Sequence, residues 1–138
     1  MLNLLKQKTK VILDTNFLLL PGEFGVDIFT EIKRISTEPI EICILDKTMQ
    51  ELKLMIETKG QKKEGFNAKL GYIMTKQKNL KTLTSSKHNY ADDALVEIVS
   101  KNPKKTIIAT QDKELQKRIQ NKKGRIITLK QNKYLQLR

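Results

Sequence analysis

Short apolar runs alternate with amphipathic segments along this chain of 138 residues, and this alternation limits the fold more than any other feature. The first run, at residues 11–13, is typical of a buried strand. The segments between the runs place apolar side chains at helical spacing. Strands that alternate with helices favour a parallel sheet with helices on both faces, so we expect an α/β fold.

The pattern assigns an approximate range to each element. It predicts strands at residues 11–13, 40–45, 106–109 and 125–129. It predicts helices within residues 18–35, with an interruption at Pro21-Gly22, and at residues 48–58, 63–80, 91–101 and 113–122. The segment 81–90 is polar and is predicted to be a loop. Because no repeat or long linker divides the chain, we expect a single domain over residues 1–138.

Acidic residues follow two of the predicted strands and begin two of the predicted helices. Asp14 follows the first strand and Asp112 follows the third, and ligands of parallel sheets bind beyond the carboxyl ends of the strands. These two acids should therefore meet at one edge of the sheet, although they are far apart in the sequence. Glu51 and the pair Asp92-Asp93 lie near helix starts. Converging carboxylates make a site for a hard divalent cation.

Each acid also has a purely structural explanation. Residues such as Asp14 and Asp112 can cap the helices that follow them. Thr48-x-x-Glu51 fits a capping box, in which the glutamate returns to the backbone of the cap. The doubled charge of Asp92-Asp93 exceeds what a single cap uses, and like charges this close repel unless a cation or base compensates. Convergence in space is therefore what separates a metal site from a set of caps.

The chain is strongly basic around these acidic positions. Its formal net charge is +12, and residues 101–138 hold twelve basic residues against two acidic ones. This excess favours a polyanionic partner, although lysines on helix faces also serve solubility. With Cys43 as the single cysteine and His88 as the single histidine, a disulfide, a cysteine-cluster zinc site or a histidine-based triad is disfavoured.

Nothing in the sequence favours a membrane protein. The longest apolar run, at residues 17–21, is far shorter than a membrane span. The first six residues are too few and too polar for a signal peptide. We therefore expect a soluble, cytoplasmic protein that keeps Cys43 reduced.

Four blocks of this sequence, in this order, resemble a PIN domain. They are residues 11–16 (Val-Ile-Leu-Asp-Thr-Asn), the acid of 46–52, residues 90–97 (Tyr-Ala-Asp-Asp-Ala-Leu-Val-Glu) and residues 108–115 (Ile-Ala-Thr-Gln-Asp-Lys-Glu-Leu). The resemblance covers nearly the whole chain, and the four blocks at this spacing are fairly specific. The last two blocks most resemble the archaeal and eukaryotic branch tied to processing of small-subunit ribosomal RNA. The resemblance to the toxins of VapBC systems is looser.

The resemblance implies a three-layer α/β/α sandwich around a parallel sheet and a single-strand RNA endonuclease that depends on Mg²⁺ or Mn²⁺. Carried over to this sequence, the catalytic and metal-binding acids would be Asp14, Glu51, Asp93 and Asp112. Asp92 is the alternative to Asp93, and Asn16 and Thr110 would be supporting polar contacts. Family members often dimerise, so a homodimer is also implied.

The basic residues around the site are expected to follow an RNA backbone, and Tyr90 or Tyr134 would stack on bases. The residues chosen as RNA contacts are Lys62, Lys63, Lys69, Lys76, Lys113, Lys117 and Arg118. Two alternatives remain open. One is a non-catalytic or weakly catalytic RNA-binding module for ribosome assembly, and the other is a VapC-type toxin ribonuclease restrained by an antitoxin.

Overall fold

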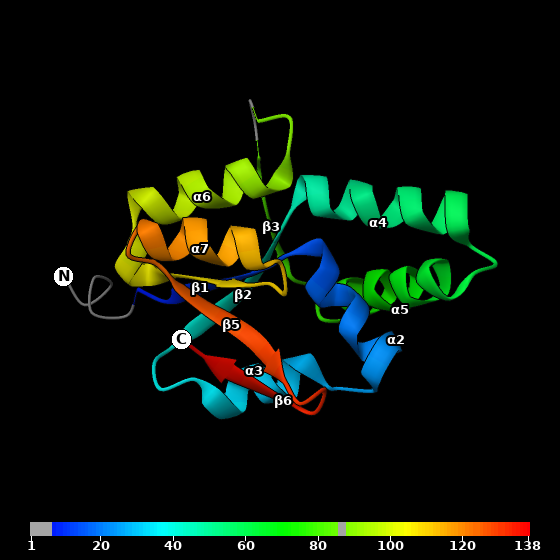
Figure 1. Ribbon diagram of the computed structural model, residues 1–138, viewed down its shortest axis with the longest axis horizontal. Helices are drawn as coiled ribbons and strands as arrows, with labels where there is room; N and C mark the ends of the chain where they lie inside the picture. Colours follow the sequence, from blue (N-terminus) through cyan, green and yellow to red (C-terminus); the bar gives the residue numbers. More distant parts are fainter. Residues whose placement is uncertain (1–6, 86–87) are drawn as a thin grey trace.

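In the computed structural model, which describes residues 7–85 and 88–138, six strands form one sheet (Figure 1). Its order is β3 (Lys81–Leu83), β2 (Ile40–Leu45), β1 (Thr9–Leu13), β4 (Thr106–Ala109), β5 (Arg125–Lys130) and β6 (Tyr134–Leu137). Strands β1 to β5 are parallel, and β6 runs antiparallel to β5. Because the chain moves outward from β1 to β3 and then returns to β4, the strand order reverses between β1 and β4.

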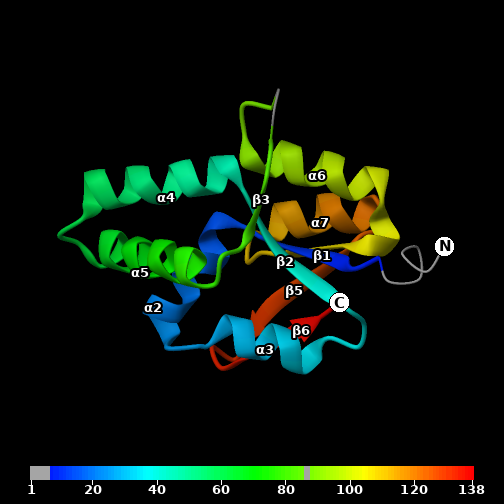
Figure 2. The same cartoon turned by 180° about the vertical axis from the view of Figure 1, so that it is seen from behind.

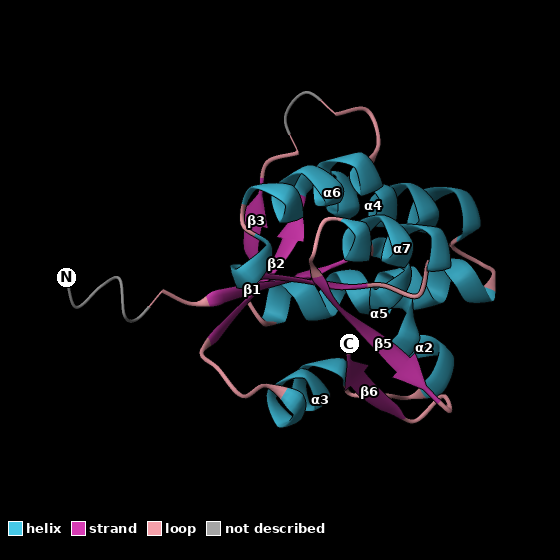
Figure 3. Ribbon diagram, turned by 60° about the vertical axis from the view of Figure 1, so that its left-hand side comes forward, coloured by secondary structure: helices cyan, strands magenta, loops and turns pink. Residues whose placement is uncertain are grey.

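The helices lie on both faces of this sheet, as the alternating pattern predicts. In chain order they are the 3-10 helix η1 (Thr15–Leu19), α2 (Leu20–Phe24), α3 (Ile28–Ile35), α4 (Asp46–Lys59), α5 (Lys63–Gln77), α6 (Ala91–Lys101), the 3-10 helix η2 (Pro103–Lys105) and α7 (Lys113–Asn121). Figure 3 shows α6 and α7 on one side of the sheet and α3 on the other. The expected three-layer α/β/α fold is confirmed. None of the helices described here is long and apolar enough to cross a bilayer.

The two faces of the sheet bury separate apolar clusters. Val11 and Leu13 of β1 pack in the cluster shared with α3 and α5, whereas Ile12 packs in the cluster shared with α6 and α7. All three side chains are fully buried, which explains why the run is apolar at every position rather than at alternate ones. Cys43 is likewise buried, on the α6 face, and burial raises the pKa of its thiol to about 11.

The predicted helix within residues 18–35 is divided, and the predicted place of the break was wrong. Pro21 and Gly22 lie inside α2, where proline fits the first turn because its missing N–H has no partner there anyway. The break falls at Gly25, whose φ of +67° ends α2 in the left-handed region. Asp27 then caps α3, because its side chain accepts a hydrogen bond from the Thr30 N–H at 3.1 Å.

Two edge strands are absent from the sequence pattern. β3 lies within the segment 81–90 that was predicted to be a loop, and residues 86–87 of that segment, like residues 1–6, lie outside the described residues. β3 has only three residues, mostly exposed, so it lacks an apolar run. β6 also alternates between exposed and buried positions, and it pairs through a hairpin whose turn residues Gln131 and Asn132 have positive φ. The sheet is therefore parallel except at this edge.

Helices α4 and α5 form an antiparallel pair beside the sheet, visible from both sides in Figures 1 and 2. The glycines that weaken the helical pattern of α5 have a packing role. A β-carbon at Gly71 would lie 2.4 Å from the Leu18 carbonyl oxygen of η1 and 3.3 Å from the Leu18 β-carbon. Gly71 therefore lets α5 approach η1, which directly follows the first acidic position.

Gly71→Ala tests this close approach because two effects act in opposite directions. Within an isolated helix, alanine would stabilise by about 1 kcal/mol relative to glycine. Here the clash with Leu18 should dominate, so we expect Gly71→Ala to lower the unfolding free energy by about 1–3 kcal/mol in urea denaturation. Lys69→Ala, at an exposed position of α5, is the control and should be neutral or slightly stabilising. A stabilised Gly71→Ala protein would contradict the packing described here.

Candidate active site

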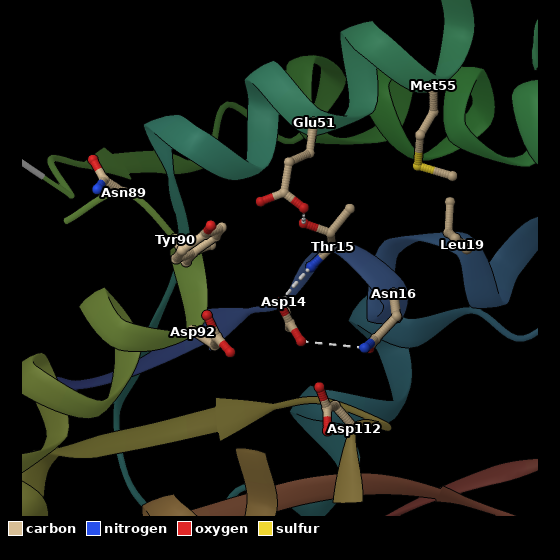
Figure 4. A pocket seen from close by; sticks show the side chains of 11 residues that line it. Asp14, Thr15, Asn16, Leu19, Glu51, Met55, Asn89, Tyr90, Asp92 and Asp112 are labelled. Carbon is tan, nitrogen blue, oxygen red and sulfur yellow. Dashed lines mark hydrogen bonds between the residues drawn. The ribbon is translucent and has the colours of Figure 1, made fainter. Parts of the chain in front are cut away.

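A cavity of about 520 Å³ opens beyond the carboxyl ends of β1 and β4, where the strand order reverses (Figure 4). This is the place where open α/β sheets bind their ligands. Four acidic residues line it, each from a different part of the chain: Asp14, Glu51, Asp92 and Asp112. The sequence-based expectation that acids following β1 and β4 meet at one edge agrees with this geometry.

Asp14 follows β1 directly and is only 8% exposed. Its Oδ1 accepts a hydrogen bond from the Thr15 N–H at 2.9 Å. Its Oδ2 accepts hydrogen bonds from the Asn16 side-chain amide at 3.2 Å and from the Thr110 hydroxyl at 2.7 Å. The carboxyl group is therefore held in one orientation by donors from both sides of the strand-order reversal.

Thr110 and Asn16 join the segment after β1 to the segment after β4. The fully buried Thr110 hydroxyl donates to Asp14 and accepts from the Asp112 N–H at 3.1 Å. The Asn16 side-chain oxygen accepts from the Gln111 N–H at 3.1 Å. Both residues therefore hold the acids in position. Asn16 also lines the cavity, whereas Thr110 does not.

Glu51 points from α4 toward the same cavity (Figure 4). Its Oε2 accepts a hydrogen bond from the Thr15 hydroxyl at 3.1 Å. The capping-box alternative does not hold, because α4 begins at Asp46 and its cap residue is Leu45. The Thr48 hydroxyl is buried and has no hydrogen-bond partner among the described residues.

The neighbouring acids Asp92 and Asp93 take different positions on the first turn of α6. Asp92 lines the cavity, whereas Asp93 is not among its lining residues. Asp93 instead accepts a hydrogen bond from Arg118 of α7 at 2.8 Å. Arg118 also lies 3.6 Å from Asp92, so one guanidinium group partly neutralises both carboxylates. The geometry thus favours Asp92, the alternative in the sequence-based assignment, as the third acid of the cavity.

Asp112 lines the cavity and also caps α7. Its Oδ1 accepts hydrogen bonds from the N–H groups of Glu114 and Leu115 at 3.0 and 3.2 Å. The capping interpretation and the site interpretation are therefore both correct for this residue. Since only one carboxylate oxygen serves the cap, capping fixes the direction of Asp112 while leaving it beside the cavity.

Two of the acids, Asp14 and Glu51, have pKa values above their ordinary values. Burial is the main cause that raises the pKa of Asp14 above its ordinary value, and the charges of Asp112 and Asp92 add to it. Burial likewise raises the pKa of Glu51, again with a contribution from the charges of Asp14 and Asp92. The cavity therefore concentrates negative charge that hydrogen bonds compensate only in part, which is the electrostatic requirement for binding a cation.

The donor set fits a hard divalent cation. The cavity offers carboxylate oxygens, and its lining contains no thiolate or imidazole ligand, which suits Mg²⁺ or Mn²⁺ better than zinc. Within residues 7–85 and 88–138, no three aspartate, glutamate, histidine or cysteine side chains lie close enough together to bind one metal ion directly. Mg²⁺ usually keeps several waters and needs only one or two carboxylates, so a cavity of this kind remains suitable.

The remaining lining is partly apolar. Leu19 and Met55 form one wall and Tyr90, 70% exposed, stands on the opposite side with Asn89 (Figure 4). Sequence reasoning identified Tyr90 but missed the other three. Met55 belongs to the apolar spacing of α4, which predicted a core position, and Leu19 and Asn89 carry no signal of their own.

None of the seven basic residues chosen as RNA contacts lines the acidic cavity. Lys113, Lys117 and Arg118 lie on α7, which begins beside it. Lys63 of α5 lines a neighbouring cavity that shares Leu19 with the acidic one. The other three also belong to α5 or to its cap: Lys62, Lys69 and Lys76. Tyr134 lies in β6, away from the acids, so Tyr90 is the aromatic residue at the site.

The fold and the site together define an α/β protein with an acidic cavity at the switch point of its sheet. A family model described as a PIN-like domain matches residues 11–132. The chain therefore belongs to the PIN-like domain family, as its sequence blocks suggest.

Two known proteins resemble the chain over nearly its full length. One is ribonuclease VapC4 of Methanocaldococcus jannaschii, which is 31% identical over 131 residues and aligns with 93% of this chain and 95% of its own. The other is the solved PIN domain endonuclease Utp24. It superposes with a TM-score of 0.77 at 24% identity and covers 93% of this chain and 90% of its own, which supports the fold.

Thr110→Val tests the link between the two segments that carry Asp14 and Asp112. The substitution keeps the shape of the side chain but removes the hydroxyl, so the buried Asp14 loses a donor and the Asp112 N–H loses an acceptor. We expect the unfolding free energy to fall by about 1–3 kcal/mol in urea denaturation with EDTA present. Thr110→Ser keeps the hydroxyl and should retain most of that stability. Equal losses in the two variants would show that the methyl group, not the hydroxyl, stabilises this link.

Proposed function

We propose that this protein is a divalent-metal-dependent endoribonuclease that hydrolyses phosphodiester bonds in single-stranded RNA. The observation that carries the proposal is the convergence of four carboxylates, from four separate segments, on one cavity at the switch point of the sheet. The family and the name of the VapC4 relative agree with ribonuclease activity. The net charge of +12 suits a polyanionic substrate.

Asp14, Asp92 and Asp112 would hold Mg²⁺ or Mn²⁺ in this cavity, with Glu51 as a further ligand or as a partner of bound water. A bound divalent ion supplies Lewis-acid polarisation of the phosphate and lowers the pKa of water. The Arg118 side chain, which contacts both acids at the start of α6, limits the negative charge next to the incoming phosphate.

The protein residues orient the reaction. Glu51 has Oε2 fixed by Thr15, so its other oxygen can accept a proton from the water that attacks phosphorus. Water adds to phosphorus while the bond to the 3′ oxygen breaks. The departing 3′ oxygen takes a proton from solvent, so the products are a 5′-phosphate and a 3′-hydroxyl. Asp14 is kept from rotating by Thr110 and Asn16, which preorganises the site before substrate binds.

Single-stranded RNA is the substrate class that the walls of the cavity favour. Tyr90 exposes most of its ring directly beside Asp92, and Leu19 and Met55 offer apolar contact on the other wall. A base can stack on such a ring only when it is unpaired or turned out of a helix. Paired bases would leave this aromatic surface unused.

The cellular role is proposed in two forms. The resemblance of the blocks at residues 90–97 and 108–115 supports a role in ribosomal RNA processing, where the protein would act on a ribosomal RNA precursor. The second candidate is a toxin ribonuclease, which the similarity to VapC4 favours. In that role the protein would need an antitoxin partner, and a homodimer would be expected. Growth arrest on expression, relieved by Asp14→Asn, would favour the toxin role.

The neighbouring acids of α6 provide a matched pair of variants for the proposed activity. We expect Asp92→Asn to reduce cleavage of a single-stranded RNA in Mn²⁺ by more than about 100-fold, since it removes a proposed metal ligand. Asp93→Asn removes only an exposed ion pair with Arg118 and should change the rate by about fivefold at most. The measurement is the single-turnover cleavage rate on one labelled RNA.

Asp14→Asn completes this experiment, because it should abolish cleavage while RNA binding, measured by fluorescence anisotropy, persists. EDTA should stop cleavage by the unmodified protein. Loss of activity in Asp93→Asn with full activity in Asp92→Asn would overturn the assignment of the third acid. Cleavage that resists EDTA and Asp14→Asn would overturn the proposed function as a whole.

Tyr90→Ala tests the stacking role. Base stacking on an aromatic side chain contributes about 1–3 kcal/mol per base, so we expect KM for single-stranded RNA to rise by about five- to 150-fold. Tyr90→Phe keeps the ring and should bind as the unmodified protein does. An unchanged KM in Tyr90→Ala would show that no base rests on this ring.

A further inference from the structure

A second cavity, of about 210 Å³, lies at the opposite, amino-terminal edge of the sheet. Four lysines line it: Lys8, Lys10, Lys101 and Lys105. They come from the start of β1, the end of α6 and the short helix η2, which meet at the left of Figure 1. None of these lysines lines the acidic cavity, and none is among the seven basic residues named above as RNA contacts.

The position of Lys10 in the sheet shows that this cavity lies on the face of the sheet that α6 covers, just beyond the apolar core of that face. Side chains of a strand alternate between faces, so Lys10 lies on the same face as Ile12, which is fully buried under α6 and α7. Its neighbour on β4 is Thr106, which also lines the cavity. A lysine at a core-facing register position of a central strand is unfavourable unless it can reach water or an anion.

The lysine charge at this cavity is compensated only in part. Glu41 of β2 is the register neighbour of Lys10, but it lies outside the cavity lining. No acidic residue lines it. Among the described residues, the only ion pair within 4.0 Å that involves these four lysines joins Lys101 to Glu97, at 3.5 Å. The simplest structural explanation is that a lysine at the end of α6 complements the helix dipole. That explanation covers Lys101 but not Lys8 and Lys10, which precede or begin a strand. Four ammonium groups around one cavity repel unless an anion joins them.

The spacing between the two cavities suits a nucleic-acid strand. α6 begins next to Asp92 and ends at Lys101, a length of about 15 Å at 1.5 Å per residue. Along β1, Lys10 and Asp14 are separated by about 13 Å. A stacked strand advances by about 3.4 Å per nucleotide, so the gap corresponds to about four or five nucleotides. α7 runs beside α6 and presents exposed Lys117 on the way.

We propose that the lysine-lined cavity at the amino-terminal edge of the sheet binds phosphate groups of an RNA strand, a few nucleotides away from the bond that lies at the acidic cavity. The proposal rests on the proposed function for the identity of the strand. It adds a site that contributes to affinity for longer RNA and takes no part in the chemical step.

The test is the salt dependence of RNA binding, measured by fluorescence anisotropy in EDTA so that no cleavage occurs. A cavity variant replaces Lys8, Lys10, Lys101 and Lys105 by glutamine. Each phosphate contact to a single strand contributes about 0.7 to the slope of log affinity against log salt, so the slope for an RNA of about 20 nucleotides should fall by about two to three. Binding of an RNA of about four nucleotides should change less than binding of the long RNA, because a short RNA can occupy only one of the two cavities at a time.

The control variant carries the same change of charge at positions outside both cavities, with Lys33, Lys78, Lys130 and Lys133 replaced by glutamine. It should lower the slope of log affinity against log salt by less than about one, because it changes only the net charge of the protein and removes no proposed phosphate contact. A second variant, Lys101→Gln with Lys105→Gln, leaves β1 intact and should give about half the effect of the cavity variant. Equal losses in the cavity and control variants would overturn the proposal, as would equal losses for long and short RNA.

Two further outcomes distinguish this proposal from the proposed function and from binding of free phosphate. Because binding is measured without divalent metal, a protein that never cleaves RNA but shows this length-dependent binding would contradict the proposed function alone. The cavity variant should cleave the short RNA in Mn²⁺ at the unmodified rate. If the variant loses binding of inorganic phosphate in calorimetry while long RNA binds normally, the cavity binds free phosphate and the RNA proposal is wrong.

Discussion

The hydrogen bond from the Thr110 hydroxyl to Asp14 is the contact on which the rest of the site depends. It joins residues 96 positions apart in the sequence, across the two strands where the order of the sheet reverses. The same hydroxyl accepts from the Asp112 backbone, so one buried side chain sets the distance between two of the four acids. A parallel sheet supplies the framework, but this bond turns an edge of the sheet into a defined cavity.

The sequence predicted the parts of the fold that depend on local pattern. Residues 11–13 of β1 form a continuous apolar run because the run is buried on both faces, and the meeting of Asp14 with Asp112 follows from strand order alone. β3 and β6 could not be predicted this way, because they are short edge strands whose pairing depends on neighbours rather than on composition. The antiparallel edge was missed for that reason.

The sequence predicted which short segments carry the candidate site, but it did not always predict which residue of a segment lines the cavity. Choosing between Asp92 and Asp93 requires the rotation of α6 about its axis, which tertiary packing against α7 and Arg118 determines. Tertiary structure also determines the partner of Glu51. The spacing of a capping box suggested a partner within the same helix, but the Glu51 carboxylate accepts a hydrogen bond from Thr15 instead. Apolar cavity residues such as Met55 cannot be told from core residues by their spacing in the sequence, because one face of the helix carries both kinds of residue.

The order of the strands also governs when the cavity can exist during synthesis. Three of its four acids, at positions 14, 51 and 92, leave the ribosome before β4 (Thr106–Ala109) is available to pair with β1. Until then β1 lacks its central neighbour, Asp14 lacks the Thr110 hydroxyl, and the fourth acid is missing. A chain that stops before Asp112 therefore cannot assemble the cavity, and any activity that the cavity has begins only after the segment from β4 to Asp112 has been made.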